Sequence, residues 1–133
     1  MNAIFESTKT YSDLLGRLLL AAIFITAGYG KIGGYAATQG YMEAMGVSGA
    51  LLPLVIFAEL GGGLAILFGL LTRYAALGLA VFSVASAVIF HSSADQAQQI
   101  MFMKNLAIAG GLLILVANGP GRLSLDTKLF GKA

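Results

Sequence analysis

The residue type best placed to do chemistry is a single carboxylate, Glu59, in an otherwise apolar stretch, AELGGGLAILFGLLTR, that spans residues 58–73. A charged side chain at the centre of a bilayer costs on the order of 3 kcal/mol on insertion scales, so such an acid is a functional-site hypothesis by default. Glu59 could bind a ligand or exchange protons. It could also pair with a lysine and only hold the helices in register.

A few other polar side chains could join this acid, and each has a structural interpretation as well. Lys31 and Lys104 stand near the ends of apolar stretches, where a single lysine commonly anchors a helix at the membrane interface. His91 begins a polar loop, where an exposed histidine often has no special role. Methionines near His91 would suit Cu(I), but methionine is also ordinary membrane filler, and the sequence predicts no metal site.

The composition indicates a membrane protein. Of 133 residues, 58% are hydrophobic and 11% are charged, and the mean hydropathy is +0.86. A soluble domain needs roughly a quarter of its residues charged. Cysteine is absent and there is one histidine, which excludes thiol redox chemistry, cysteine-held metals and bis-histidine haem within one chain. The basic residues are scattered, so we expect no nucleic-acid partner.

The elements that must position these residues are four apolar stretches, each long enough to cross a membrane. They predict an all-α membrane protein, in which one domain, residues 1–133, forms a four-transmembrane-helix antiparallel bundle. The predicted spans are residues 14–32, 51–71, 75–90 and 102–117.

The segments outside the spans are expected to be polar or interfacial. Residues 1–13 should remain in water, with Ser12 or Asp13 as the N-cap of the first span, which we interpret as a retained helix rather than a signal peptide. Tyrosines and methionines recur at helical spacing within residues 33–49, which predicts a short interfacial helix between spans 1 and 2. The tail after Gly121 alternates apolar and charged residues, which predicts an amphipathic segment on the membrane surface.

Basic residues predict the orientation. Four spans place both termini on one side, and cytoplasmic loops are enriched in lysine and arginine. Six basic residues fall on the terminus side and two on the other, so we expect cytoplasmic termini, with Arg17, Arg73 and Arg122 as topology anchors. The first group is Lys9, Arg17, Arg73, Arg122, Lys128 and Lys132, and the second is Lys31 and Lys104.

Helical spacing places the charged residues on glycine-rich faces. Glu59, Gly62, Gly63 and Gly69 share one face of the second span, and Arg17, Phe24, Gly28 and Lys31 share one face of the first. Glycine lets a neighbouring backbone approach closely, which is how helices associate in lipid. The expected helix-packing glycines are Gly28, Gly62, Gly63, Gly69, Gly110 and Gly111.

These motifs resemble the DoxX family of small bacterial inner-membrane proteins, including the branch described as quinol oxidase subunits. The resemblance covers nearly the whole chain and implies a four-helix bundle in the bacterial inner membrane and a link to quinone-dependent redox complexes. The matching segments are LLGRLLLAAIFITAGYGKI, FAELGGGLAILFGLLTR, the HSS loop, MFMKNLAIAGGLLIL and GPGRLSLD.

Together these observations predict an accessory subunit of a quinone-linked redox complex, with a quinone as the expected ligand and a polar pocket in the periplasmic half of the bundle. The chain carries no complete catalytic or cofactor-ligand set, so electrons would come from a partner protein. The alternatives are a small proton-coupled transporter and a non-enzymatic structural or assembly protein, and a homo-oligomer is a further expectation. The candidate pocket residues are Glu59, Lys31, His91, Lys104, Asn105, Phe24, Phe57 and Phe90.

Overall fold

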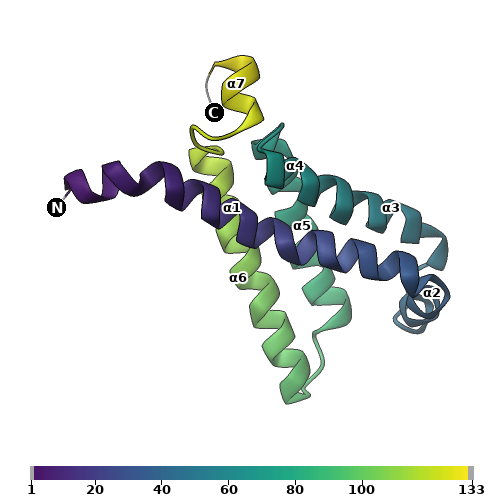
Figure 1. Ribbon diagram of the computed structural model, residues 1–133. Coiled ribbons are helices and arrows are strands. Elements are labelled where there is room, and N and C mark those ends of the chain that lie inside the picture. The colour runs from purple at the N-terminus through teal and green to yellow at the C-terminus, as the bar shows by residue number, and fades with distance from the viewer. Residues whose placement is uncertain (1, 132–133) are drawn as a thin grey trace.

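The computed structural model describes residues 2–131, and over that range the chain is built from helices and loops without a β-strand. Four helical stretches are long and apolar enough to cross a membrane. They account for most of the molecule in Figure 1. The predicted all-α, four-helix membrane fold is confirmed.

The first helix, α1, runs from Asn2 to Gly33 without a break. Its 32 residues span about 48 Å, which exceeds the roughly 30 Å of a hydrocarbon core. The predicted start of this helix near residue 14, with an N-cap at Ser12 or Asp13, is therefore wrong. Residues 2–13 contain neither glycine nor proline to stop the helix, and its N-terminal turns project away from the other helices (Figure 1).

The second crossing, residues 49–68, is not one regular α-helix. It follows α2, the expected short helix between the first two spans, and Pro53 lies in the first turn of α3, where its missing N–H is tolerated. A five-residue π-helix, η2, interrupts the crossing at Glu59. The bounds are α2 Tyr35–Ala44, the 3₁₀ turn η1 Gly49–Leu51, α3 Leu52–Ile56, η2 Phe57–Gly61 and α4 Gly62–Phe68.

The last two crossings are α5, Thr72–Phe90, and α6, Gln96–Asn118. Both are longer than expected from hydropathy. The polar loop that begins at His91 is short, because residues 96–99 form the first turn of α6. Gly69 at the end of α4 has a φ of 69°, a left-handed conformation that glycine adopts readily, and allows the sharp turn into α5.

The crossings form two helix pairs. α1 packs along α3, η2 and α4, while α5 packs most extensively along α6. Figure 1 shows that the second pair crosses the first instead of lying parallel to it. The core therefore lies where the pairs meet. It comprises Ala21, Phe24, Ile66, Ala76, Leu79, Ala80, Ala109, Leu112 and Leu115.

The C-terminal helix α7, Leu125–Phe130, is tied to the bundle by its acid. Asp126 is buried, and its carboxylate accepts hydrogen bonds from the backbone N–H groups of Leu71 and Thr72, at 2.6 and 2.9 Å. The tail thus caps the start of α5, and its predicted position on the membrane surface stays a prediction. Lys132, one of the basic residues used to predict the orientation, lies outside the described residues.

Candidate functional site

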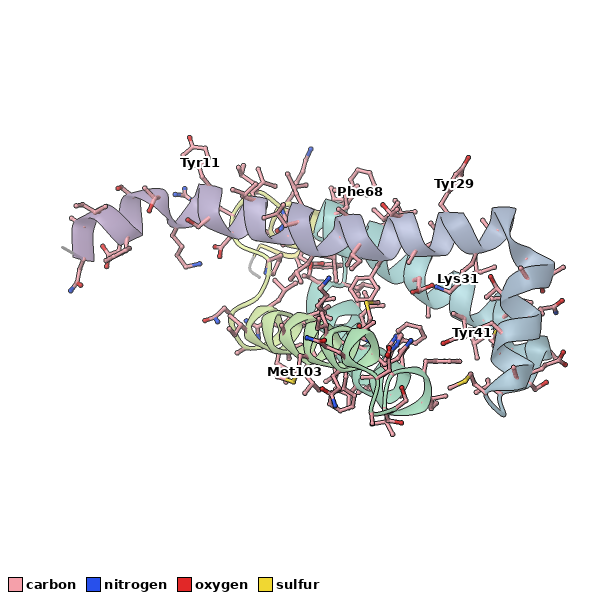
Figure 2. The ribbon with its side chains drawn as sticks, turned by 90° about the horizontal axis from the view of Figure 1, so that it is seen from below. Tyr11, Tyr29, Lys31, Tyr41, Phe68 and Met103 are labelled. Carbon is pink, nitrogen blue, oxygen red and sulfur yellow. The ribbon has the colours of Figure 1, made fainter. Side chains whose placement is uncertain are left out.

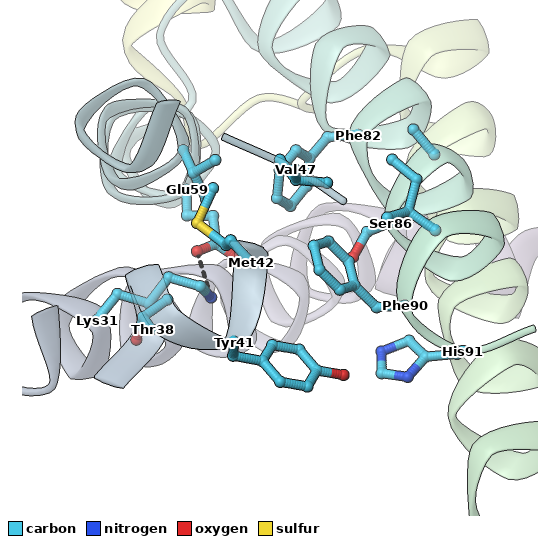
Figure 3. Close-up of a pocket in the computed structure, with 13 residues that line it drawn as sticks. Lys31, Thr38, Tyr41, Met42, Val47, Glu59, Phe82, Ser86, Phe90 and His91 are labelled. Atoms are coloured by element: carbon cyan, nitrogen blue, oxygen red, sulfur yellow. Dashed lines mark ion pairs between the residues drawn. The ribbon is translucent and has the colours of Figure 1, made fainter. Parts of the chain in front are cut away.

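A cavity of about 290 Å³ lies at the end of the bundle opposite to the termini, between α2, η2 and the last turns of α5. We call it the Glu59 pocket. Most of its lining is apolar or aromatic, and its charged residues come from α1 and η2 (Figure 3). The lining residues are Lys31, Thr38, Tyr41, Met42, Val47, Val55, Glu59, Phe82, Ala85, Ser86, Ile89, Phe90 and His91.

The charges in this pocket form one ion pair. Lys31 Nζ lies 2.7 Å from Glu59 Oε1, and the Glu59 side chain is only 6% exposed, against 28% for Lys31. This separation is typical of a charge-assisted contact between an ammonium and a carboxylate, so Lys31 occupies Oε1 of Glu59. A carboxylate has about four lone-pair sites, so Glu59 can still accept a hydrogen bond from a ligand.

Glu59 lies in the π-helical turn η2. Short π-helical turns inside α-helices frequently occur at functional sites. Glu59 is buried together with Gly63 and Ile66 of the same crossing, so the inward face predicted from helical spacing continues through this turn. Phe57 is 73% exposed, because residues two positions apart point to different sides of a helix.

Gly28 allows α1 to come close to η2. A Cβ at Gly28 would lie 2.8 Å from Leu60 Cγ and 3.1 Å from the backbone nitrogen of Leu60. Because there is no Cβ, the backbones approach each other and Lys31, one turn further along α1, reaches Glu59. The position of the ion pair therefore depends on a glycine.

An aromatic pair borders the other side of the pocket. The rings of Tyr41 on α2 and Phe90 on α5 stack with centroids 5.4 Å apart. The Tyr41 hydroxyl points toward the ring of His91 (Figure 3). His91 Nδ1 lies 2.6 Å from Gln98 Oε1, and this contact orients the imidazole.

The structure brings four of the predicted pocket residues together and separates the other four. Lys31, Glu59, Phe90 and His91 line the Glu59 pocket. Phe24 lies in the hydrophobic core and Phe57 is exposed. On α6, Lys104 lines a different, shallow hollow, and Asn105 donates a hydrogen bond to the Ser83 carbonyl at 3.2 Å.

Sequence reasoning missed Thr38, Tyr41 and Met42 as pocket residues. All three come from α2, and their spacing of three and four residues places them on one face of that helix. Helical spacing indicates this common face of α2, but it does not show which other helices the face contacts. Figure 2 shows Lys31 and Tyr41 turned inward, whereas Tyr11 and Tyr29 point away from the bundle.

The expected topology anchors differ in their surroundings. Arg73 and Arg122 are exposed, whereas Arg17 is 2% exposed inside the bundle. Its guanidinium donates to the carbonyl of Ile66 at 3.5 Å and to that of Leu123. Arg17 therefore links α1, α4 and the C-terminal segment, and its role in topology stays a prediction.

The predicted packing glycines also differ. Close neighbours face Gly62 and Gly63, where a Cβ would lie 3.0 Å from Leu79 Cδ1 and 2.9 Å from Ile25 Cγ1. Gly69 has no room for a Cβ, which would overlap Arg17 and Ser124. Gly111 makes only an ordinary contact, with Leu20, and nothing in the described part of the chain lies within 4 Å of a Cβ at Gly110.

Comparison with known proteins places this geometry in a family. Residues 12–92 match the family model described as DoxX. The chain is 58% identical over 117 residues to the inner membrane protein YqjF of Escherichia coli K12, covering 87% of this chain and 90% of that protein. It is 32% identical over 132 residues to the inner membrane protein YphA of the same organism, covering 93% and 94% of the two chains. No solved structure matches the chain. The chain therefore belongs to the DoxX family of small bacterial inner-membrane proteins.

Proposed function

We propose that the protein binds a quinone or quinol headgroup in the Glu59 pocket, as an accessory subunit of a quinone-linked redox complex. The observation that carries this proposal is the Lys31–Glu59 ion pair, with 2.7 Å between Nζ and Oε1, which lines an aromatic-walled cavity. A quinone headgroup combines a flat apolar ring with polar oxygen atoms. Both features have counterparts in this pocket.

The size and lining of the pocket support a ring-shaped ligand. Small-molecule sites enclose roughly 300–1,000 Å³ and are mostly apolar, with a few polar groups that fix the orientation. At about 290 Å³ the Glu59 pocket would take a headgroup while the tail lies outside among lipids. Phe82 and Phe90 supply aromatic surface for the ring.

The polar residues suit both redox forms of such a ligand. The Lys31 ammonium can donate to a quinone carbonyl oxygen, and Glu59 can accept a hydrogen bond from a quinol hydroxyl. Tyr41 and His91 lie at the side of the pocket away from the ion pair and can exchange protons with water. A bound quinone would supply a two-electron, two-proton couple, and these residues would position it and hold its protons.

Electron transfer requires a second protein in this proposal. The chain has no cysteine and one histidine, so we propose that a partner oxidoreductase exchanges electrons with the bound quinone. We further propose cytoplasmic termini, in accordance with the six basic residues on that side, which puts the Glu59 pocket in the periplasmic half of the membrane. A homo-oligomer would be compatible with the exposed helix faces.

Direct binding tests the proposal. Decylubiquinone is titrated into the purified full chain in lipid nanodiscs, and bound and free quinone are separated by size. We expect saturable binding that is lost in Ser86→Leu, where the larger side chain fills the pocket. Val88→Leu, on the same helix but outside the pocket lining, serves as the matched control and should bind normally. Equal binding by both variants, or none by the unchanged protein, would refute the proposal.

A charge exchange separates ligand binding from a structural role of the ion pair. Lys31→Glu combined with Glu59→Lys keeps the pair but reverses its direction. If the pair only holds the bundle together, the exchanged protein should regain both stability and any associated partner. If Glu59 contacts the ligand, stability should recover while decylubiquinone binding remains lost.

A further inference from the structure

We infer that a second site, at the terminus end of the bundle, binds one phospholipid with an ethanolamine headgroup. This site is independent of the proposed quinone pocket. It is a groove of about 230 Å³ between the first half of α1 and the end of α6, which we call the terminus groove. Its lining residues are Lys9, Ser12, Asp13, Gly16, Arg17, Leu20, Gly111, Ile114, Leu115, Asn118 and Gly119.

The groove exists because two glycines face it. A Cβ at Gly16 would meet nothing within 4 Å, and a Cβ at Gly111 would meet only Leu20, at 3.5 Å. α1 and α6 therefore approach each other here without filling the space between them. In a membrane, lipid is the material in contact with such a space.

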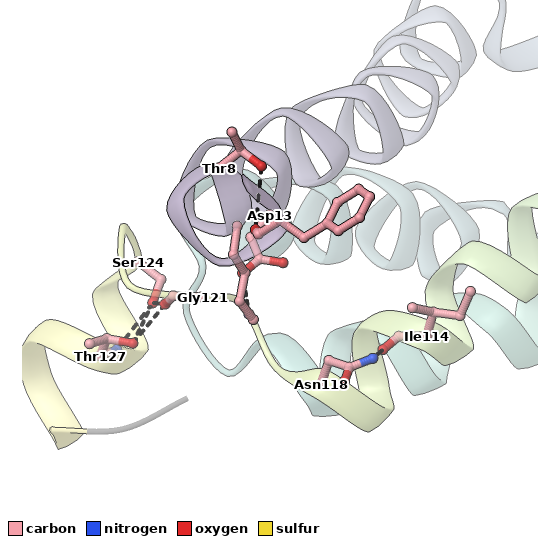
Figure 4. Close-up of polar contacts among 9 residues, drawn as sticks. Thr8, Asp13, Ile114, Asn118, Gly121, Ser124 and Thr127 are labelled. Atoms are coloured by element: carbon pink, nitrogen blue, oxygen red, sulfur yellow. Dashed lines mark hydrogen bonds and ion pairs between the residues drawn. The ribbon is translucent and has the colours of Figure 1, made fainter. Parts of the chain in front are cut away.

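The lining changes from polar to apolar along the helices. Lys9, Ser12 and Asp13 lie near the projecting end of α1, and Asn118 is the last residue of α6. Further along the same groove the lining is Gly16, Leu20, Gly111, Ile114 and Leu115. Figure 4 shows Asp13 on α1 near Asn118 and Ile114 of α6. This order matches an amphiphile whose headgroup lies at the end of the helices and whose acyl chain extends toward the centre of the membrane.

The charges in and around the groove favour a zwitterionic headgroup. Lys9 Nζ pairs with Asp13 Oδ2 at 2.6 Å, and these side chains remain 61% and 24% exposed. The charged residues of the lining are two cations, Lys9 and Arg17, and one acid, Asp13. Two cations beside one acid match a headgroup that carries both a phosphate and an amine, because the phosphate attracts the cations and the amine attracts the acid.

Arg17 adds a buried hydrogen-bond donor to the lining of the terminus groove. Its guanidinium is held by the carbonyls of Ile66 and Leu123, but its Nε has no hydrogen-bond partner among the described residues. An unpartnered, buried N–H is costly, and a phosphate oxygen could accept from it after a small adjustment of the groove. Lys9 would hold the same phosphate from the exposed side.

Asp13 favours a lipid headgroup with a primary amine over the other common headgroups. A primary ammonium can donate hydrogen bonds to the carboxylate, whereas a choline group has no N–H and a glycerol headgroup has no positive charge. The Asp13 side chain is also held in place, because Gly121 packs against it so closely that a Cβ there would lie 2.7 Å from Asp13 Oδ2. A fixed acid at the headgroup level is a suitable receptor for ethanolamine.

The test is a lipid competition on the full chain. The protein is reconstituted in vesicles of equal parts POPE, POPC and POPG and extracted in mild detergent, and the retained lipid is identified by native mass spectrometry. We expect one tightly retained POPE, enriched about tenfold over each competitor, the factor that corresponds to about 1.4 kcal/mol. Equal retention of the three lipids, or a preference for POPG, would overturn the inference.

Two variants assign the preference to this groove. Gly16→Leu fills the groove and should abolish the enrichment, whereas Gly30→Leu, an equally open glycine on the same helix but outside the groove, should retain it. Asp13→Asn keeps the shape of the side chain and should reduce the preference for POPE over POPC to near unity. An unchanged preference in Gly16→Leu and Asp13→Asn would place the lipid elsewhere.

Discussion

The two ends of the bundle both contain buried charged side chains, but these side chains have different partners. At the terminus end, Arg17 and Asp126 bond to backbone groups of segments that are distant in sequence. At the opposite end, Glu59 contacts one lysine and a cavity. The first arrangement joins the helices, although Arg17 also lines the terminus groove. The second places an ion pair against a cavity.

This difference indicates how a buried charge should be interpreted in a small membrane bundle. A buried charge bonded to helix ends and loops replaces the water that those backbone groups lack, so its role is structural. A buried charge whose contacts are one side chain and a cavity, with no bond to the backbone of another segment, has capacity left for a ligand. Burial alone, which Arg17 and Glu59 share, does not distinguish the two roles.

The largest expected effect tests the terminus end. Gly69→Ala adds a Cβ at a residue with φ of 69°, where it would overlap Arg17 and Ser124. We expect a loss of about 3 kcal/mol of stability, from overpacking and the left-handed backbone together. Thermal unfolding in detergent measures it, with Gly78→Ala as the control because no neighbour faces that position. A normal melting temperature for Gly69→Ala would mean that this end is not tightly packed.

The next largest effect tests whether the opposite end tolerates loss of its charges. Lys31→Met leaves Glu59 buried without its cation and should cost about 2 kcal/mol, less than a fully buried pair because Lys31 is 28% exposed. Combining it with Glu59→Leu should restore most of the stability. Unfolding of both variants measures this. A double variant that remains as unstable as Lys31→Met would show that the pair itself holds the bundle together.

A smaller effect is expected at the α7 cap. Asp126→Ala removes the acceptor for the N–H groups of Leu71 and Thr72 and should cost about 1–2 kcal/mol. Hydrogen exchange at those two amides should increase before global unfolding. Protection that stays unchanged would contradict the capping role of α7. Decylubiquinone binding should remain normal in this variant, because α7 does not line the Glu59 pocket.

The smallest expected effect tests a predicted packing glycine. Gly110→Ala should change the stability of the single chain by less than about 1 kcal/mol, in the direction of greater stability, because alanine favours a helix and nothing described lies near that position. If Gly110 instead lies in a contact between copies, Gly110→Leu should convert an oligomer to a monomer in size-exclusion chromatography. An unchanged oligomeric state would exclude that contact.

The spans were predictable because hydropathy is a local property. The ends of the spans were less so, since α1 continues through a polar segment that lacks any residue to stop it. The Lys31–Glu59 pair could be predicted because these spans contain few charged residues, which leaves few possible partners for a buried acid. Grouping Lys104 and Asn105 with it failed, because Asn105 bonds to α5 and Lys104 lines a different hollow, and helical spacing does not show which face of α6 meets a neighbour.

By itself, the sequence determined the membrane environment, the four helices and the identity of the one acid within the second span, because these depend on residue type and order along the chain. The packing of the helices decides which buried charges bond to the backbone of distant segments and which bond only to another side chain beside a cavity. Glu59 pairs with Lys31 because Gly28 lets the backbones of α1 and η2 approach each other closely. Arg17 is buried because the C-terminal segment folds back over it. Both outcomes arise from contacts between distant segments, which local patterns of hydropathy and spacing do not encode.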